Sequence, residues 1–170
     1  MSLKNFFSIF FMIFFSFAVF AEELEIKNEY TEFNVYTGTF DFSDDGKKST
    51  LIGFQHQNEN LNRDTFLGNI SPVTGALITA DNAGYVYTGV QAQYKIGALN
   101  FTPSFAPGYY EKGQGKDLGS VLEFKSEIKV GFDIFENSKL SYSYSHISNN
   151  DWGDTNPGTD NQQITFSKNF

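Results

Sequence analysis

The segment 121–136 alternates regularly between apolar and charged side chains, and this alternation limits the folds that the chain can adopt. One parity carries Leu122, Phe124, Ser126, Ile128, Val130, Phe132 and Ile134, and the other carries Glu123, Lys125, Glu127, Lys129 and Asp133. Successive side chains of a strand point to opposite faces, so the segment predicts a strand with one apolar face and one charged face. A half-buried strand of a soluble sandwich has the same period, so this segment alone leaves a soluble sandwich and a membrane barrel open.

Alternation of this kind extends over most of the chain and predicts eight strands. Turn-forming residues separate segments at about 30–43, 48–58, 62–79, 83–97, 99–112, 119–136, 138–150 and 159–170. These segments exceed the mode of about 5–6 residues for strands of soluble proteins. They match the roughly 9–11 residues that a tilted membrane strand needs. The sequence therefore predicts an all-β protein, an eight-stranded antiparallel transmembrane β-barrel of the outer membrane, with a soluble periplasmic barrel or sandwich as the alternative.

The first 21 residues have a different composition from the rest and predict a cleaved signal peptide. Lys4 precedes an apolar run at 6–20, and the small residue Ala21 ends it. The domains expected are a signal peptide at 1–21 and a single β-barrel domain at 22–170.

Charge and residue usage exclude several classes of function. The chain has 12 Lys and Arg against 20 Asp and Glu with no basic run, which argues against a nucleic-acid partner. It has no Cys, and its two His residues are far apart, so no metal site is expected. Eight strands enclose a lumen that side chains fill, which excludes a general porin. Phe170 ends the chain and shares its parity with Ile164 and Phe166, a pattern that resembles the signal read by the outer-membrane assembly machinery.

One group of residues near the C-terminus could carry out hydrolysis. Tyr142, Tyr144, His146 and Ser148 share one parity, which we assign to the lipid-facing side because small polar residues suit a narrow lumen. A hairpin centred on Gly153 would place Asp160 opposite His146, within reach of a carboxylate–imidazole hydrogen bond. A nucleophile, a base and an acid that orients the base are what metal-free ester hydrolysis needs.

Geometry alone favours a simpler interpretation of these residues. Ser, His and aromatic side chains are common at barrel rims, where they form hydrogen bonds at the membrane interface. In that case the protein is a small barrel without enzymatic activity, with a structural or binding role.

A resemblance to a known family favours the enzyme instead. The relevant segments are Pro107–Tyr109, Gly115–Gly119, Leu122–Ser126, Ser145–Asn150 and Asn156–Asp160, followed by the terminal Phe170. Over about residues 99–170 they resemble the lipid A 3-O-deacylase family of outer-membrane barrels, which are acyloxyacyl hydrolase-like.

The resemblance implies an esterase that removes the ester-linked 3-hydroxyacyl chain at the 3-position of lipid A. It implies Ser148 as nucleophile, His146 as general base and then acid, and Asp160 as the orienting carboxylate, where the family usually has Glu. Asn156 and Asn149 are the candidates for oxyanion stabilisation, although Asn149 points inward by parity and Asn156 could belong to an ordinary turn. Phe124 could hold an acyl chain or simply contact lipid.

The resemblance also suggests the partners. No cofactor is expected. The partners expected are lipid A or lipopolysaccharide of the outer leaflet and the assembly machinery, with a homodimer left open. Because acidic residues lie in the predicted outer loops, a weak divalent-cation requirement is a further hypothesis, which fails if a chelator leaves activity unchanged. Those acidic residues are Asp44, Asp45, Asp151 and Asp154.

Overall fold

The computed structural model describes residues 31–44 and 47–170, so the predicted signal peptide at 1–21 lies outside the described residues. Eight long strands follow one another along the chain. They are β1 (Thr31–Phe40), β2 (Ser49–Asn58), β4 (Gly68–Thr79), β5 (Gly84–Ala92), β7 (Leu99–Glu111), β8 (Leu122–Phe135), β9 (Ser138–Ser148) and β10 (Thr159–Asn169). Three short elements lie between them, η1 (Glu59–Leu61), β3 (Arg63–Thr65) and β6 (Tyr94–Ile96).

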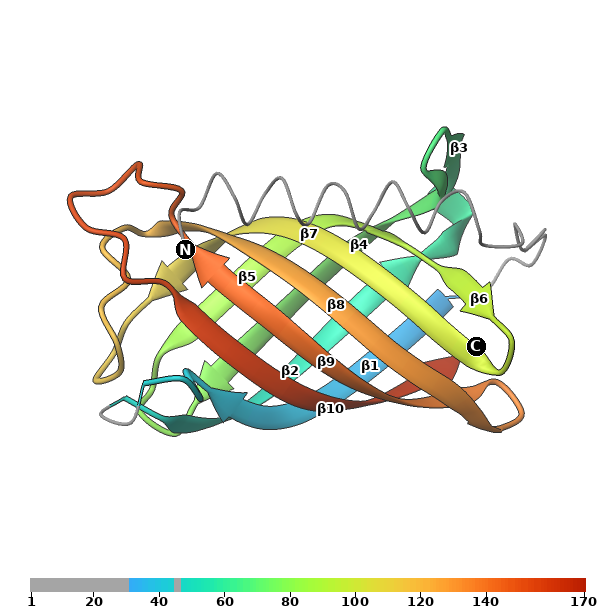
Figure 1. Ribbon diagram of the computed structural model, residues 1–170, viewed down its shortest axis with the longest axis horizontal. Coiled ribbons are helices and arrows are strands. Elements are labelled where there is room, and N and C mark those ends of the chain that lie inside the picture. The colour runs from blue at the N-terminus through green and yellow to red at the C-terminus, as the bar shows by residue number, and fades with distance from the viewer. Residues whose placement is uncertain (1–30, 45–46) are drawn as a thin grey trace.

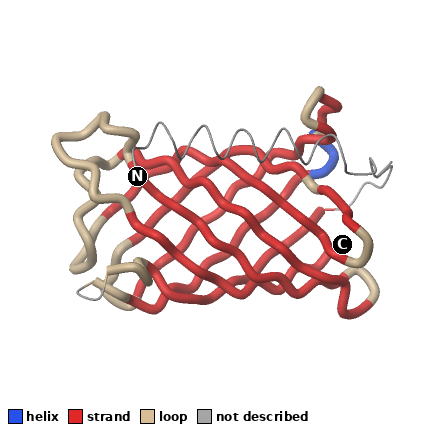
Figure 2. The backbone as a smooth tube through the Cα atoms, viewed as in Figure 1, coloured by secondary structure: helices blue, strands red, loops and turns tan. Residues whose placement is uncertain are grey.

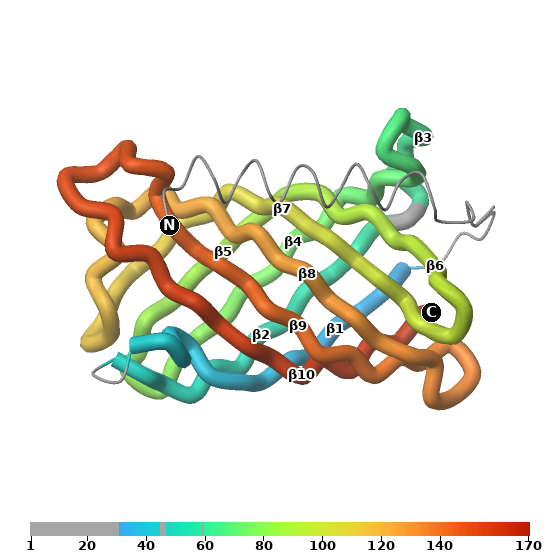
Figure 3. The backbone as a smooth tube through the Cα atoms, in the orientation of Figure 1, coloured from blue at the N-terminus to red at the C-terminus, as the bar shows by residue number. Residues whose placement is uncertain are grey.

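The long strands form one closed antiparallel barrel, as predicted (Figure 1). Each long strand pairs with the next long strand along the chain, so that β2 pairs with β4 and β5 pairs with β7. The barrel closes where β1 pairs with β10, so the first and last strands lie side by side in Figure 3. Backbone hydrogen bonds between Thr31 and Phe170 secure this seam at one end, where the Phe33 and Phe170 rings lie 5.7 Å apart.

The loops divide the barrel into two unlike ends (Figure 2). Three longer loops, 41–48, 112–121 and 149–158, lie at one end, together with the short turn between β4 and β5. The C-terminus and the two-residue turn between β8 and β9 lie at the other end. Outer-membrane barrels place their longer loops outside the cell, so β9 runs outward and ends near the extracellular rim. Within the described ranges, no helix is long and apolar enough to cross a bilayer.

Two predicted segments are each divided in the structure. The segment 62–79 contains β3 and β4, because Thr65–Gly68 forms a tight turn in which Gly68 has φ +86°. The hydroxyl of Thr65 accepts a hydrogen bond from the backbone N–H of Leu67 and stabilises this turn. The segment 83–97 divides into β5 and β6 at Gln93, whose side chain donates to Gln57 Oε1 in the lumen.

Side chains alternate between the lumen and the outer surface as the sequence indicates. Large apolar residues on the outer surface remain exposed and form a surface suited to lipid. They include Val35, Ile52, Ile78, Val86, Val130, Phe132 and Ile164.

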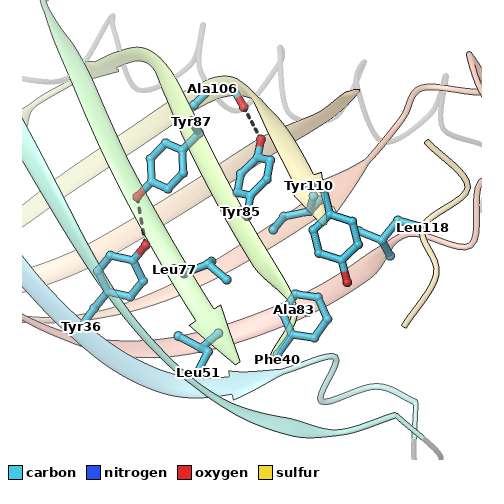
Figure 4. Close-up of a cluster of buried hydrophobic side chains, with 11 residues drawn as sticks. Tyr36, Phe40, Leu51, Leu77, Ala83, Tyr85, Tyr87, Ala106, Tyr110 and Leu118 are labelled. Atoms are coloured by element: carbon cyan, nitrogen blue, oxygen red, sulfur yellow. Dashed lines mark hydrogen bonds between the residues drawn. The ribbon is translucent and has the colours of Figure 1, made fainter. Parts of the chain in front are cut away.

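Inward side chains fill the lumen. Buried aromatic and aliphatic residues cluster toward the end with the longer loops, and two of their rings, Tyr36 and Tyr87, point at each other in Figure 4. Their hydroxyls lie 3.1 Å apart. Gly53 and Gly75 make room for these rings, because a Cβ would lie 2.2 Å from a ring atom of Tyr36 and 2.5 Å from one of Tyr87.

Two charged residues of β8 form an ion pair inside the lumen. Lys125 Nζ lies 2.7 Å from Glu127 Oε2, and both side chains are almost fully buried. The same ammonium group lies 4.4 Å from the centre of the Tyr87 ring. Lys139 forms a second inward ion pair, at 2.6 Å from Glu32. The charged parity of β8 therefore faces the lumen, where Lys125 and Glu127 pair with each other.

Candidate functional site

Strands β8, β9 and β10 bring the predicted catalytic residues together on the outer surface. His146 on β9 lies opposite Asp160 on β10 and opposite Ser126 on β8. Ser148, two residues farther along β9, lies opposite Phe124. The register predicted for the last hairpin is the observed one, so His146 and Asp160 are direct cross-strand neighbours.

The imidazole of His146 contacts the carboxylate of Asp160. His146 Nδ1 lies 2.8 Å from Asp160 Oδ1, and the two side chains are 23% and 29% exposed. A carboxylate oxygen can only accept, so Nδ1 donates and the lone pair of the neutral ring lies on Nε2. The short Asp side chain makes this contact because opposed Cβ atoms in an antiparallel pair lie only about 5 Å apart.

Two further donors hold the same carboxylate in place. Tyr144 donates its hydroxyl to Asp160 Oδ1 at 2.6 Å, and Ser43 donates to Oδ2 at 3.2 Å. Tyr144 precedes His146 by two residues on the same face, whereas Ser43 belongs to the loop after β1, across the seam of the barrel. Three donors on one carboxylate fix its orientation, and through it the orientation of the imidazole.

Ser148 lies at the end of β9, on the same face as His146, and only 5% of its surface is exposed. Gly158 lies beside the imidazole just before β10. A Cβ at Gly158 would lie 3.0 Å from His146 Cε1 and 3.2 Å from Nε2, and its φ of +61° also favours glycine. Glycine at this position therefore leaves room on the side of the ring where Nε2 lies.

The two predicted oxyanion residues have other contacts in the structure. The buried amide of Asn149 points inward and donates to the carbonyls of Leu118 at 2.8 Å and Thr155 at 2.7 Å. The backbone N–H of Asn149 donates to Asn156 Oδ1 at 3.1 Å, and Asn156 Nδ2 donates to Asp151 at 3.0 Å. Asn149 thus ties the loop 112–121 to the loop 149–158, and Asn156 lies next to the backbone that follows Ser148.

The loop 112–121 packs tightly against the loop 149–158. A Cβ at Gly119 would lie 2.1 Å from the carbonyl oxygen of Thr155. Lys112 donates to Asp117 at 2.7 Å, and this hydrogen bond lowers the pKa of the exposed Asp117 carboxyl. Asp117 also accepts a hydrogen bond from the backbone N–H of Gly119 at 3.0 Å. These contacts give the loop beside Ser148 a defined shape.

Aromatic side chains flank the His146–Ser148 pair on both sides. Phe124 stacks on Phe105 of β7 with ring centres 6.0 Å apart, and it meets Trp152 edge-on at 5.1 Å. On the opposite side, Phe42 meets Tyr144 edge-on at 6.0 Å. The catalytic candidates therefore lie between two apolar surfaces that face the lipid.

Sequence reasoning did not identify four of these residues. Tyr144 could have been found, because it shares the face of His146 two residues away. In the sequence, Gly158 indicates only a turn. Trp152 indicates only the membrane interface. Ser43 gave no signal, because its contact with Asp160 joins residues 117 positions apart.

No residues gather into a metal site in the described ranges, where no group of three His, Cys, Asp or Glu side chains could hold an ion. One of the acidic loop residues, Asp44, has a cation nearby, because Lys116 Nζ lies 3.5 Å from Asp44 and 2.8 Å from the buried Asp41. The cation hypothesis therefore remains a prediction for the loops rather than for a defined site.

Residues 29–169 match the model of one protein family, lipid A 3-O-deacylase (PagL). The chain belongs to this family. Among curated proteins, none matches the sequence. The family assignment from the resemblance is confirmed, and the match also covers strands before residue 99, where the resemblance gave no signal.

Two solved structures are similar to this lipid A 3-O-deacylase family member. The crystal structure of the outer membrane enzyme PagL has a TM-score of 0.61 and 12% identity, and the match covers 81% of this chain and 98% of that one. A structure from the de novo design of transmembrane β-barrels has a TM-score of 0.60 and 11% identity, covering 86% of this chain and 100% of that one. At these identities the likeness shows the barrel fold alone.

Proposed function

We propose that this protein is an outer-membrane esterase that removes the ester-linked 3-hydroxyacyl chain at the 3-position of lipid A. Membership of the lipid A 3-O-deacylase family supports both the proposed reaction and the location in the outer membrane. The observation that carries the choice of residues is the 2.8 Å contact between His146 and Asp160 on the lipid-facing surface, beside Ser148. A titratable pair on that surface is costly unless it has a use.

The chemistry is a two-step acyl transfer. His146 Nε2 takes the proton of the Ser148 hydroxyl while Ser148 Oγ attacks the ester carbonyl carbon. The tetrahedral intermediate collapses, the bond to the sugar oxygen breaks, and His146 returns the proton to that oxygen. A water molecule from the headgroup side then loses a proton to His146 and attacks the acyl-enzyme. The 3-hydroxy fatty acid leaves, and the proton returns to Ser148.

Asp160 acts by orienting and stabilising the imidazole. With Nδ1 donating to the carboxylate, the ring presents Nε2 as a base and gains stabilisation when it becomes imidazolium. The hydrogen bonds from Tyr144 and Ser43 keep the carboxylate in position for this role.

Asn149 and Asn156 are the proposed oxyanion donors, with different donor groups. The side chain of Asn149 is engaged between two loops, so its contribution comes from the backbone N–H, which directly follows Ser148. Asn156 accepts that N–H in the structure. Rotation of the Asn156 amide on substrate binding would present both its Nδ2 and the Asn149 N–H to the developing negative charge.

Phe124 is the proposed contact for the acyl chain. It lies opposite Ser148 and continues into the stack with Phe105, so a chain bound to Ser148 would lie along these rings.

Mass spectrometry of lipid A from cells that express the wild type, Ser148→Ala or Ser141→Ala tests this function. Ser141 is a matched control, because it lies on the same strand but faces the lumen. We expect loss of one 3-hydroxyacyl group with the wild type and with Ser141→Ala, and intact lipid A with Ser148→Ala. Intact lipid A in all three strains, with the barrel folded, would refute the enzyme and favour the barrel without enzymatic activity.

A further inference from the structure

Ser126 is a polar residue in an apolar row of the outer surface. Its neighbours on the same face of β8 are Phe124 and Ile128, with Val130 beyond them. Only 7% of its surface is exposed, although the side chain faces outward by parity. A serine hydroxyl directed at hydrocarbon is costly unless it has a hydrogen-bond partner.

Larger side chains surround Ser126. It lies opposite Phe105 on β7 and opposite His146 on β9, and Phe124 precedes it on the same face. Serine is smaller than each of these neighbours and lies directly across from His146 in the sheet. The row across the sheet thus reads Phe105, Ser126, His146 and Asp160.

The hydroxyl of Ser126 has no hydrogen bond to another side chain or to the backbone among the residues that the structure describes. Three outward threonine hydroxyls on other strands do have partners. Thr74 and Thr88 lie 3.1 Å apart, and Thr37 donates to the carbonyl of Leu51 at 2.8 Å. Ser126 therefore places a hydrogen-bond donor and acceptor beside the imidazole of His146, on the outward face of β8.

The separation of Ser126 from Ser148 suits one feature of the substrate. Ser126 faces His146, so Ser148 is its diagonal neighbour, and such Cβ atoms lie about 7 Å apart. In a 3-hydroxyacyl ester the hydroxyl oxygen is three bonds from the carbonyl carbon, or about 3–4 Å at ~1.5 Å per bond. The bond from Ser148 Oγ to that carbon and a hydrogen bond of about 2.8 Å to Ser126 complete a span of roughly 7–8 Å.

We infer that Ser126 binds the 3-hydroxyl group of the acyl chain and makes the enzyme selective for 3-hydroxyacyl esters. This inference rests on the proposed function and adds a specificity-determining residue to it. The hydroxyl of Ser126 exchanges a hydrogen bond with the substrate, while Phe105 and Phe124 contact the rest of the chain. An ester without the hydroxyl leaves Ser126 unpaired in an apolar surrounding, and its transition state is less stable for that reason.

Two substrates of equal chain length, one with and one without the 3-hydroxyl, test the inference. Purified full-length protein in detergent is assayed for release of each fatty acid as the wild type, Ser126→Ala, Ser126→Thr and Thr88→Val. Thr88→Val is the matched control, because it removes a lipid-facing hydroxyl far from the site. Heat-modifiable gel migration shows that each variant is folded.

We expect Ser126→Ala to lower kcat/KM for the hydroxylated ester by roughly 3- to 10-fold, the worth of one hydrogen bond. Its kcat/KM for the plain ester stays within about twofold, so the preference between the substrates falls by the same factor. Ser126→Thr keeps the hydroxyl and the preference, and Thr88→Val leaves both rates unchanged.

An equal loss on both substrates with Ser126→Ala, or no loss on either, would overturn the inference. A folded wild type that cleaves neither ester is a different result. It would refute the proposed function, and the Ser126 subsite with it.

Discussion

Replacing Asp160 by Asn should reduce turnover strongly while leaving the barrel intact. Asn keeps the size of the side chain but removes the charge that His146 faces at 2.8 Å. At an effective dielectric constant of about 20, opposite charges about 4 Å apart attract by about 4 kcal/mol. That is about a thousandfold in rate at about 1.36 kcal/mol per factor of ten.

The exposure of the pair reduces this effect. The two side chains are 23% and 29% exposed, so solvent screens part of the attraction. We therefore expect kcat to fall by about 10²–10³-fold, with KM nearly unchanged, because the imidazolium forms only during reaction. Tyr144→Phe is the graded comparison, since it removes one of the donors to the same carboxylate and should cost about 3- to 10-fold.

The assay is the release of 3-hydroxy fatty acid from purified lipid A in detergent micelles, quantified by mass spectrometry over a range of substrate concentrations. Folding of each variant is checked by heat-modifiable migration. An Asp160→Asn protein that is folded and retains more than about a fifth of wild-type kcat would show that the carboxylate does not support His146 as argued.

Three further changes test other parts of the structure. Gly158→Ala introduces a Cβ about 3.0 Å from the His146 ring at a position with φ +61°, and should lower kcat at least tenfold in the same assay. Trp152→Ala removes the edge-on contact with the phenyl ring beside Ser148 and should raise KM a few-fold. Lys125→Met removes the cation that lies 2.7 Å from the buried Glu127 carboxylate and should destabilise the barrel by about 3–5 kcal/mol, measured by urea unfolding in detergent.

Each of these predictions has a control variant or a result that would contradict it. Lys112→Met breaks an exposed ion pair of the same 2.7 Å length and should leave stability unchanged. Equal stability of the Lys125→Met and Lys112→Met proteins would mean that the lumen pair contributes little. For Gly158→Ala, wild-type activity would show that the imidazole has more room than the structure gives it. For Trp152→Ala, an unchanged KM would show that the indole does not contact the substrate.

The parts of the fold that were predictable from sequence are those set by local pattern. Alternation from Leu122 to Asp133 defined the lumen and outer faces of β8, because the side-chain period of a strand is two, and it ends at the register shift between Asp133 and Phe135. Gly153, near the middle of the last loop, was enough to place Asp160 opposite His146. The inward direction of Asn149 followed from the same parity.

The parts that could not be predicted depend on contacts between distant segments. The hydrogen bond from Ser43 to Asp160 exists only because β1 closes onto β10. The space that Gly158 leaves for the imidazole depends on the path of a whole loop. The break between β5 and β6 falls at Gln93, whose side chain donates to Gln57 of β2, a contact between distant segments that no local pattern encodes.

The seam between β1 and β10 also completes the set of hydrogen bonds to Asp160. Asp160 lies on the last strand, and the carboxylate receives one of its hydrogen bonds from a loop that follows the first strand. A chain that is still open lacks this one hydrogen bond, and the carboxylate is then held by His146 and Tyr144 of the last hairpin alone. Closure of the barrel would therefore complete the proposed site, and the activity proposed here should rise by the several-fold worth of one hydrogen bond when the first and last strands join.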